Sequence, residues 1–150
     1  MTGKPKSAKK ACPEEDAFVS LLRTADLLSR NVEKLLKAGD VSPTQYNVLR
    51  ILRGAPQGLT CSEIGRRMIS RDPDITRLLD RLEKRSLVSR CRETKDRRQV
   101  QTRISPQGLR LLDDLDGPMT DLHRKQLSHL GKQGLNLLQD LLEKARVRST

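Results

Sequence analysis

Two closely spaced helix-start signals in residues 60–73 constrain the fold of this chain more than any other feature. Residues 60–63 (TCSE) have the form of a capping box, in which the first and fourth residues bond each other's backbone N–H groups. They predict a short helix through Met68. Residues 70–73 (SRDP) predict a turn and a new helix to about residue 85, with Asp72 or Ser70 as N-cap and Pro73 at its first position. Two short helices joined by about four residues have the spacing of a helix-turn-helix.

The period of the apolar residues then changes from helical to alternating. Residues 87–92 predict one strand and residues 99–104 a second, in which Val100, Thr102 and Ile104 share a face. The segment between the strands, residues 93–98, is polar and dense in charge. We therefore expect a β-hairpin with a basic tip directly after the helix-turn-helix.

Amphipathic stretches flank this central part. Apolar residues at helical spacing predict helices over residues 16–37 and 43–53, another from residue 105 with a kink at Gly117-Pro118, and a last one to about residue 145. The first and last of these carry about a dozen Leu, Val and Phe residues and no charge excess. A chain of 150 residues has little core to receive both faces. We expect a partner subunit to cover them, and packing within one chain is the alternative.

The chain carries 30 Lys and Arg against 19 Asp and Glu, a net charge of +11, and the excess is concentrated. Residues 1–12 hold four lysines and no acid, and residues 60–110 hold 14 basic and 7 acidic side chains. Such concentration is typical of a phosphate-binding face, and a merely soluble basic face is the alternative. Phe18 and Tyr46 are the only aromatic residues, which excludes modules that stack single-stranded bases on aromatic rings.

A helix-turn-helix followed by a two-stranded basic hairpin is a winged helix, and with helices at both ends this sequence resembles the MarR family of bacterial transcription regulators. The resemblance covers roughly residues 16–146, and its motifs are SPTQYNVLRIL (42–52), LTCSEIGRRM (59–68), ITRLLDRLEKRSLVSR (75–90) and DRRQVQTRISPQG (96–108). The last is similar to the family's wing signature, an Asp-x-Arg followed by a strand ending in Leu-Thr-x-x-Gly, with Ile104-Ser105 in place of Leu-Thr.

Two departures from the family pattern stand out. Ser86 occupies the position at the helix C-cap where the family usually has Gly, which implies a strained turn. Residues 71–74 (RDPD) replace a small polar run before the second helix of the motif, and so add acids near the expected DNA.

The resemblance implies a mainly α fold with a small β wing, in which a winged helix-turn-helix is flanked by N- and C-terminal dimerisation helices. Residues 1–15 are expected to form a basic disordered arm, residues 16–40 and 109–147 the dimerisation region, and residues 41–108 the DNA-binding region. It also implies a homodimer on double-stranded DNA, with the helix that begins near residue 73 in the major groove and the hairpin tip in the flanking minor groove. Small ligands or oxidants often relieve binding in this family.

Four residues at the start of that helix face the base edges in this geometry: Pro73, Asp74, Thr76 and Arg77. Arg77 has the fork of donors that binds guanine bidentately. The alternative is that Asp74 and Arg77, three residues apart, form a surface ion pair. Further along the polar face, Arg81 and Lys84 are expected to contact phosphate.

The hairpin tip supplies a second set of candidates. Asp96 and Arg98 match the family's Asp-x-Arg, in which the acid orients the arginine into the narrow, negative minor groove. Arg97 is an alternate groove contact, and a solvated charged loop is the alternative. On the first helix of the motif, Arg66 and Arg67 are candidates for contacts to the DNA backbone.

Other chemistry finds little support in the sequence. Cys12, Cys61 and Cys91 are odd in number and far apart, which fits neither a disulfide framework nor a paired metal site. His123 and His129 are six residues apart and cannot chelate one metal from one helix face. Phosphate-binding glycine loops, nucleophile elbows and HExxH motifs do not occur in the sequence, so we expect no cofactor, no metal and no enzymatic activity.

The sequence therefore predicts a sequence-specific regulator of transcription, a repressor that binds a pseudo-palindromic operator as a homodimer and is relieved by a small ligand. Since no apolar run approaches the roughly 18 residues of a membrane helix, we expect a cytoplasmic protein without a membrane partner. Two alternatives stay open: a sequence-indifferent architectural DNA-binding protein, and a thiol-based redox-sensing regulator.

Overall fold

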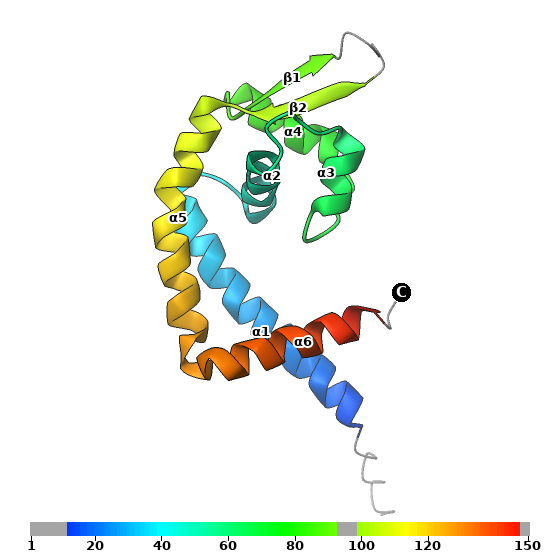
Figure 1. Cartoon of the computed structure of the whole chain (residues 1–150), viewed down its shortest axis with the longest axis vertical. Helices are drawn as coiled ribbons and strands as arrows, with labels where there is room; N and C mark the ends of the chain where they lie inside the picture. Colours follow the sequence, from blue (N-terminus) through cyan, green and yellow to red (C-terminus); the bar gives the residue numbers. More distant parts are fainter. Residues whose placement is uncertain (1–11, 93–98, 148–150) are drawn as a thin grey trace, which may run out of the picture.

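The computed structural model describes residues 12–92 and 99–147. In chain order its elements are α1 (Pro13–Leu36), the 3-10 helix η1 (Lys37–Gly39), α2 (Pro43–Arg53), α3 (Cys61–Arg67), α4 (Ile75–Lys84), β1 (Val88–Arg92), β2 (Val100–Ile104), α5 (Pro106–Leu127), η2 (Ser128–Leu130) and α6 (Gly131–Val147). Figure 1 shows α2, α3, α4 and the hairpin gathered at one end, with α1 and α5 extending away from them and α6 at the far end of α5. We call residues 41–104 the head and these three helices the arms. The mainly helical fold with a two-stranded wing is confirmed.

Helix α1 begins at Pro13 rather than at Asp16, so the predicted boundary of the N-terminal arm at residue 15 is wrong. Proline is well suited to the first helical position because its φ angle is already helical and its missing N–H is not needed there. Glu14, Glu15 and Asp16 then fill the first turn, where carboxylates meet the positive end of the helix dipole. The basic segment before the helix, residues 1–11, lies outside the described residues.

Capping boxes open both α2 and α3. Ser42 Oγ accepts a hydrogen bond from the Gln45 N–H at 3.1 Å, and Gln45 Oε1 accepts one from the Ser42 N–H at 3.0 Å. Thr60 and Glu63 exchange the same pair of bonds at 3.3 and 2.7 Å. The hydrogen bond from the Thr60 backbone lowers the pKa of Glu63. Local sequence therefore fixes the starts of α2 and α3.

The N-cap of α4 is Asp74, and the prediction of Asp72 or Ser70 was wrong. Asp74 Oδ1 accepts a hydrogen bond from the Arg77 N–H at 3.2 Å. Asp72 Oδ1 instead accepts from the Asp74 N–H at 2.8 Å, which closes a turn around Pro73. Pro73 therefore precedes the helix instead of opening it. Asp74, the residue directly before the apolar Ile75, caps the helix instead.

A Schellman turn ends α4. The Ser86 N–H bonds the Glu83 carbonyl at 2.8 Å, and the Leu87 N–H bonds the Leu82 carbonyl at 3.0 Å. Ser86 has a φ of 58°, the left-handed conformation that strains any residue with a Cβ. The strained turn predicted from Ser in place of Gly is confirmed.

The two strands of the hairpin pair antiparallel, with Val88 opposite Ile104 and Arg90 opposite Thr102. Thr102 is 1% exposed and exchanges backbone hydrogen bonds with Leu59 at 3.0 and 2.8 Å. The segment before α3 thus joins the hairpin through an isolated β-bridge. This bridge attaches the base of the wing to the connection between α2 and α3.

One hydrophobic core fills the head and reaches into the arms. Its buried residues are Leu36, Val41, Tyr46, Val48, Leu49, Leu52, Ala55, Leu59, Ile64, Leu78, Leu79, Leu82, Leu87, Val88, Leu112, Leu115 and Met119. The end of α1 and the first half of α5 are therefore anchored on the head by apolar burial.

Helix α5 continues through Gly117-Pro118, and Figure 1 shows it as one bowed helix. It ends at Leu127, so Leu130 lies in η2 and not in the helix predicted from residue 105. Gly131, with a φ of 67°, then turns the chain into α6.

The far parts of the arms bury almost nothing in this chain. Leu36 is the only buried residue of α1, and α6 has none. The exposed large apolar residues of these two helices are Phe18, Val19, Leu21, Leu22, Leu27, Leu137, Leu138, Leu141 and Val147. Apolar surface of this extent in a chain with a well-filled head indicates a missing packing partner.

Candidate nucleic-acid interface

Helix α4 separates an apolar face from a charged one. Leu78, Leu79 and Leu82 are buried in the core, which leaves the opposite face exposed. That face carries the four polar residues predicted for DNA contact on this helix: Thr76, Arg77, Arg81 and Lys84, all exposed. The helical period therefore brings these predicted residues together on one surface.

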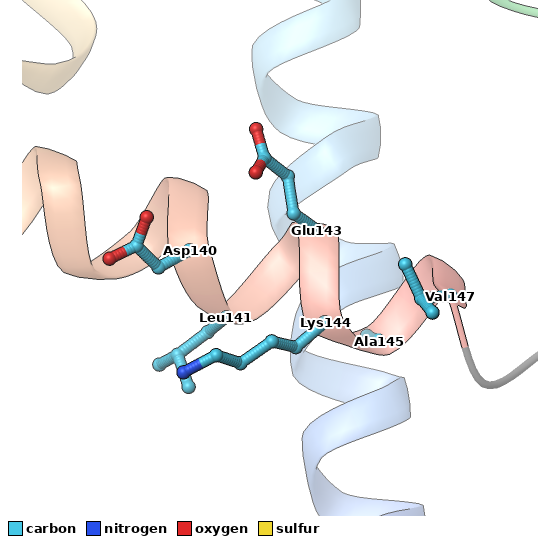
Figure 2. Close-up of a pocket in the computed structure, with 6 residues that line it drawn as sticks. All are labelled: Asp140, Leu141, Glu143, Lys144, Ala145 and Val147. Atoms are coloured by element: carbon cyan, nitrogen blue, oxygen red, sulfur yellow. The ribbon is translucent and has the colours of Figure 1, made fainter.

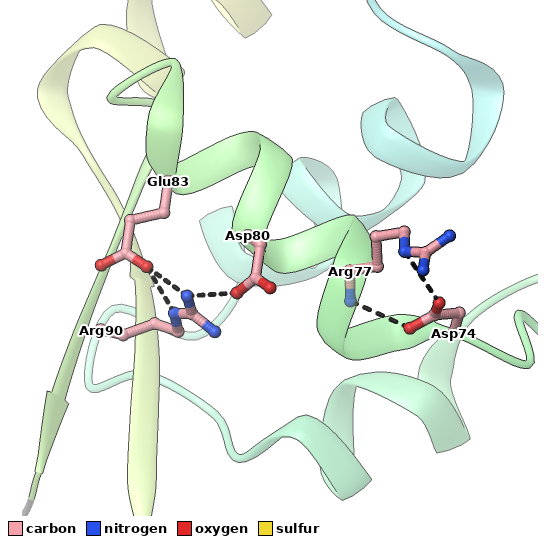
Figure 3. Close-up of polar contacts among 5 residues, drawn as sticks. All are labelled: Asp74, Arg77, Asp80, Glu83 and Arg90. Carbon is pink, nitrogen blue, oxygen red and sulfur yellow. Dashed lines mark hydrogen bonds and ion pairs between the residues drawn. The ribbon is translucent and has the colours of Figure 1, made fainter.

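Asp74 and Arg77 interact in the free chain. Asp74 Oδ2 lies 3.2 Å from Arg77 Nε, and Asp74 Oδ1 caps the helix through the Arg77 N–H. Both side chains are exposed, by 52% and 70%. The ion pair considered as an alternative from the sequence is thus present (Figure 3), and Pro73 lies exposed in the turn just before it. A pair this exposed contributes little to stability, so Arg77 can exchange its partner at small cost.

A second ionic cluster joins α4 to the hairpin. Arg90 on β1 reaches Asp80 Oδ1 through its Nη2 at 2.5 Å, and Glu83 Oε2 through Nη2 at 2.5 Å and Nε at 2.6 Å. Figure 3 shows the Arg90 guanidinium between the two carboxylates. Burial opposes the charge of Arg90, but the hydrogen bonds to Glu83 and Asp80 raise its pKa above the usual value.

Sequence reasoning missed this cluster of Asp80, Glu83 and Arg90. A signal was available, because alternation along β1 places Arg90 on the same face as the buried Val88. An arginine facing inward needs a carboxylate partner. Asp80 and Glu83 are three residues apart on the preceding helix, the spacing that lets two side chains reach one guanidinium.

The remaining predicted residues fall on two other segments. Arg66 and Arg67 are exposed in the last turn of α3, next to the turn that leads into α4. Asp96, Arg97 and Arg98 lie outside the described residues, and their placement stays a prediction.

At the base of the wing, Arg103 Nε donates to the Gln57 carbonyl at 2.8 Å. Gly58, with a φ of 93°, permits this approach, since a Cβ there would lie 2.9 Å from Arg103 Cγ. A basic side chain of β2 is thereby held against the loop between α2 and α3.

A groove of about 910 Å³ opens where the arms meet the head. Its lining includes Leu28 and Val32 of α1, Asn47 and Arg50 of α2, Met119 and His123 of α5, and Ile69 in the turn before α4. The Ile69 N–H donates to Asn47 Oδ1 at 2.9 Å, and Ile69 is 90% exposed. The groove is therefore walled in part by the segment that leads into α4.

A second hollow of about 860 Å³ is lined by residues of α6 alone. Figure 2 shows Leu141 and Lys144 on one side of the helix and Asp140 and Glu143 on the other. The described part of this chain provides no second wall to this hollow.

Cys12, Cys61 and Cys91 are free thiols, and Cys61 is half-buried at the start of α3. Within residues 12–92 and 99–147, no three His, Cys, Asp or Glu side chains cluster in a way that could hold a metal ion. None of the helices described here has the length and apolar character needed to span a bilayer.

Comparison with known proteins bears on this geometry. The model of the MarR family matches residues 41–100, which covers the head up to the first residue of β2. The transcriptional regulator FarR of Neisseria gonorrhoeae is 25% identical over 125 residues, which are 83% of this chain and 84% of FarR.

Two solved structures are similar over nearly the whole chain. A MarR transcription factor from Planctomyces limnophilus is 36% identical, with a TM-score of 0.68, over 93% of this chain and 98% of that one. The transcriptional repressor CouR, solved with a 23-mer DNA duplex, has a TM-score of 0.80 at 23% identity, over 94% of this chain and 99% of CouR. The first shares both sequence and fold with this chain, and the second shares the fold.

Proposed function

The chain belongs to the MarR family of transcription regulators, and on that premise we propose that it is a repressor that binds a pseudo-palindromic operator as a homodimer. Members of this family regulate transcription by binding DNA and are not enzymes. One observation carries the proposal: α4 exposes Thr76, Arg77, Arg81 and Lys84 on one face, beside a basic hairpin. A helix with such a face, preceded by a short helix and a turn, fits the major groove.

In the proposed complex, Thr76 and Arg77 contact base edges, and Arg81 and Lys84 contact phosphates. Asp74 has its side chain at the same end of α4, and Pro73 lies beside it in the turn. The exposure of Arg66 and Arg67 at the end of α3 supports a contact with the DNA backbone. Asp96, Arg97 and Arg98 are assigned to the flanking minor groove by their match to the family's wing signature. CouR, solved with a DNA duplex, shares this fold.

The homodimer is supported by the arms. Phe18 and Leu22 of α1 are 60% and 52% exposed, and Leu137 and Leu141 of α6 are 59% and 55% exposed. A second copy of the same helices offers a matching apolar surface, as two-fold symmetric interfaces require. The hollow along α6 then receives its second wall from the partner subunit.

The groove of about 910 Å³ is the proposed effector site. Its apolar walls, Leu28, Val32 and Met119, together with Arg50 and His123, suit a small amphipathic ligand. The groove also touches Ile69, which leads into α4, so a ligand there has a short path to the DNA-contacting helix.

Selection of binding sites from random duplex DNA with the full chain tests the proposal. We expect an inverted repeat whose half-sites lie about one helical turn apart, which reflects two heads on one face of the duplex. Competition with an unrelated duplex gives the second arm of the test. If unrelated DNA competes equally well and no motif is recovered, the chain is instead a sequence-indifferent architectural DNA-binding protein. The basic charge alone is also compatible with that function.

A further inference from the structure

Arg90 is the outermost described tie between the hairpin and α4. Its backbone lies opposite Thr102, which is itself bridged to Leu59 on the other side. Toward the tip, the last described pair is Arg92 and Val100, and both residues are exposed. The guanidinium of Arg90 therefore extends from the base of the wing and contacts α4. Beyond this contact the hairpin continues toward its tip.

The contact fixes α4 at two points. Arg90 Nη2 lies 2.5 Å from Asp80 Oδ1 and 2.5 Å from Glu83 Oε2, so one planar group spans almost a full turn of the helix. Two points of attachment restrain the rotation and the sliding of a helix more tightly than one point does. The ammonium of a lysine is a single point charge and lacks this fork.

The cluster lies next to the residues proposed to meet DNA. Asp80 and Glu83 alternate with Arg77, Arg81 and Lys84 along α4. Asp80 is 46% exposed and Glu83 41%, while Arg90 is 26% exposed. Arg90 thus has a partly shielded position, behind the exposed basic face and not on it.

We propose that Arg90 is a positioning residue that locks the wing to α4, so that the two reach one duplex as a single rigid unit. This role rests on the proposed placement of α4 and the wing on DNA. Arg90 acts through the elements it joins: when the lock is lost, α4 still reads its bases, but the wing loses its fixed approach to the flank.

Three variants distinguish a role of Arg90 in fixing the wing against α4 from a role in offsetting negative charge. Arg90→Met removes the charge and the fork, and Arg90→Lys keeps the charge but removes the fork. The triple variant Arg90→Met with Asp80→Asn and Glu83→Gln removes the carboxylates as well, so that no uncompensated acid remains near the DNA. Arg85→Met serves as the matched control, because it removes the same charge from the end of α4, where Arg85 hydrogen-bonds the Asp40 and Gly39 carbonyls and not the hairpin.

The measurement is the dissociation constant for the duplex that the wild-type protein selects from a random library, with thermal unfolding as a check on folding. We expect Arg90→Met and the triple variant to weaken DNA binding on the order of tenfold. Arg90→Lys should weaken it by at least about threefold, which is half of that effect on a logarithmic scale. Arg85→Met is expected to stay within about threefold of wild type. Repeated selection should show Arg90→Met with the central motif of the wild type but a lost flank preference.

Several outcomes would overturn the lock. Wild-type affinity in Arg90→Lys or in the triple variant would mean that Arg90 only offsets charge. A uniform loss of affinity with the flank preference intact would mean that Arg90 only stabilises the head. If Arg90→Met does not fold, Arg90→Lys carries the same test. Failure of the wild type to select any motif would instead contradict the proposed function itself.

Discussion

At the scale of single residues, Arg77 of α4 has an acidic partner in the free chain and is also the residue proposed to contact a base edge. Arg77 pairs with Asp74 in the free chain through Nε, at 3.2 Å from Oδ2. A guanidinium held through one nitrogen keeps other donors for a base edge. The exposed pair therefore presents Arg77 toward the proposed major-groove face without committing all of its donors.

Substitution of Arg77 and of Arg81 should have different signatures. Loss of one bidentate base contact costs roughly 1–3 kcal/mol at that base position, while loss of a phosphate contact weakens all sequences about equally. We expect Arg77→Ala to flatten the preference at one symmetric pair of positions, and Arg81→Ala to lower affinity uniformly. Selection from random duplexes with each variant checks this. If Arg77→Ala returns the wild-type motif at lower affinity, Arg77 contacts the backbone.

Ser86→Gly should stabilise the protein. The left-handed φ of 58° strains a residue with a Cβ by roughly 1–2 kcal/mol, and glycine adopts this conformation freely. Part of the gain is offset by the greater freedom of glycine in the unfolded chain, so we expect a net gain of roughly 0.5–1 kcal/mol. Urea unfolding measures it. Ser86→Ala is the control, because it keeps the Cβ, and an equal gain in that variant would contradict the strain.

At the scale of elements, an ion pair links the head to the arms. Arg53 of α2 donates to Asp116 of α5 at 2.7 and 3.1 Å, with Asp113 at 4.0 Å. The hydrogen bond from Arg53 lowers the pKa of Asp116, and the same bond raises the pKa of Arg53. The bidentate geometry fixes α5 against α2.

Asp116→Asn should make stability less sensitive to acid. A carboxyl with a lowered native pKa stabilises the folded state at pH values above its unfolded pKa, about 3.9, and that contribution is lost as the pH falls through the native pKa. Because the pair is partly exposed, we expect the variant to lose about 1 kcal/mol at pH 7. The gap to wild type should close on acidification toward pH 2. Urea unfolding at several pH values measures it, and Asp114→Asn, on the exposed side of α5, is the control.

Elements and caps could be predicted from sequence wherever the determining contacts are local. The capping boxes of α2 and α3 need residues only three apart, and the hairpin followed from alternation and a polar tip. The start of α4 was misplaced because Asp72 and Ser70 are also residue types that cap helices, and the local sequence does not tell them apart from Asp74. The Arg90 cluster was missed because its partners belong to another element, and only the packing of β1 on α4 brings them within reach.

At the scale of the whole molecule, the apolar surfaces of α1 and α6 should control assembly. Leu141→Glu places a charge on the exposed apolar side of α6, and burial of that charge in a subunit interface would be costly. We expect a monomer and a large loss of affinity for an inverted-repeat duplex. Sedimentation equilibrium measures the mass. Ile69→Glu, at an exposed apolar residue of the head, is the control, and it should leave the mass unchanged.

The basic charge should make DNA binding steeply dependent on salt. Each phosphate contact releases bound counterions, so the slope of log K against log salt changes by about 0.9 per contact. Two heads of a homodimer double the effect of any substitution. We expect a steep slope for wild type, reduced by about 2 for Arg81→Ala in the dimer. A flat slope would contradict the placement of α4 on DNA.

The exposed surface of α6 also has a consequence for how its helical structure responds to dilution of the protein. A helix of 17 residues with no buried side chain is close to the length at which isolated helices are only marginally stable in water. If the proposed homodimer covers α6, the order of this helix should depend on the concentration of the chain. Circular dichroism across a dilution series should show helix content falling as the chains separate, with the loss confined to the arms. A newly synthesised chain would then complete its fold only on meeting a second one.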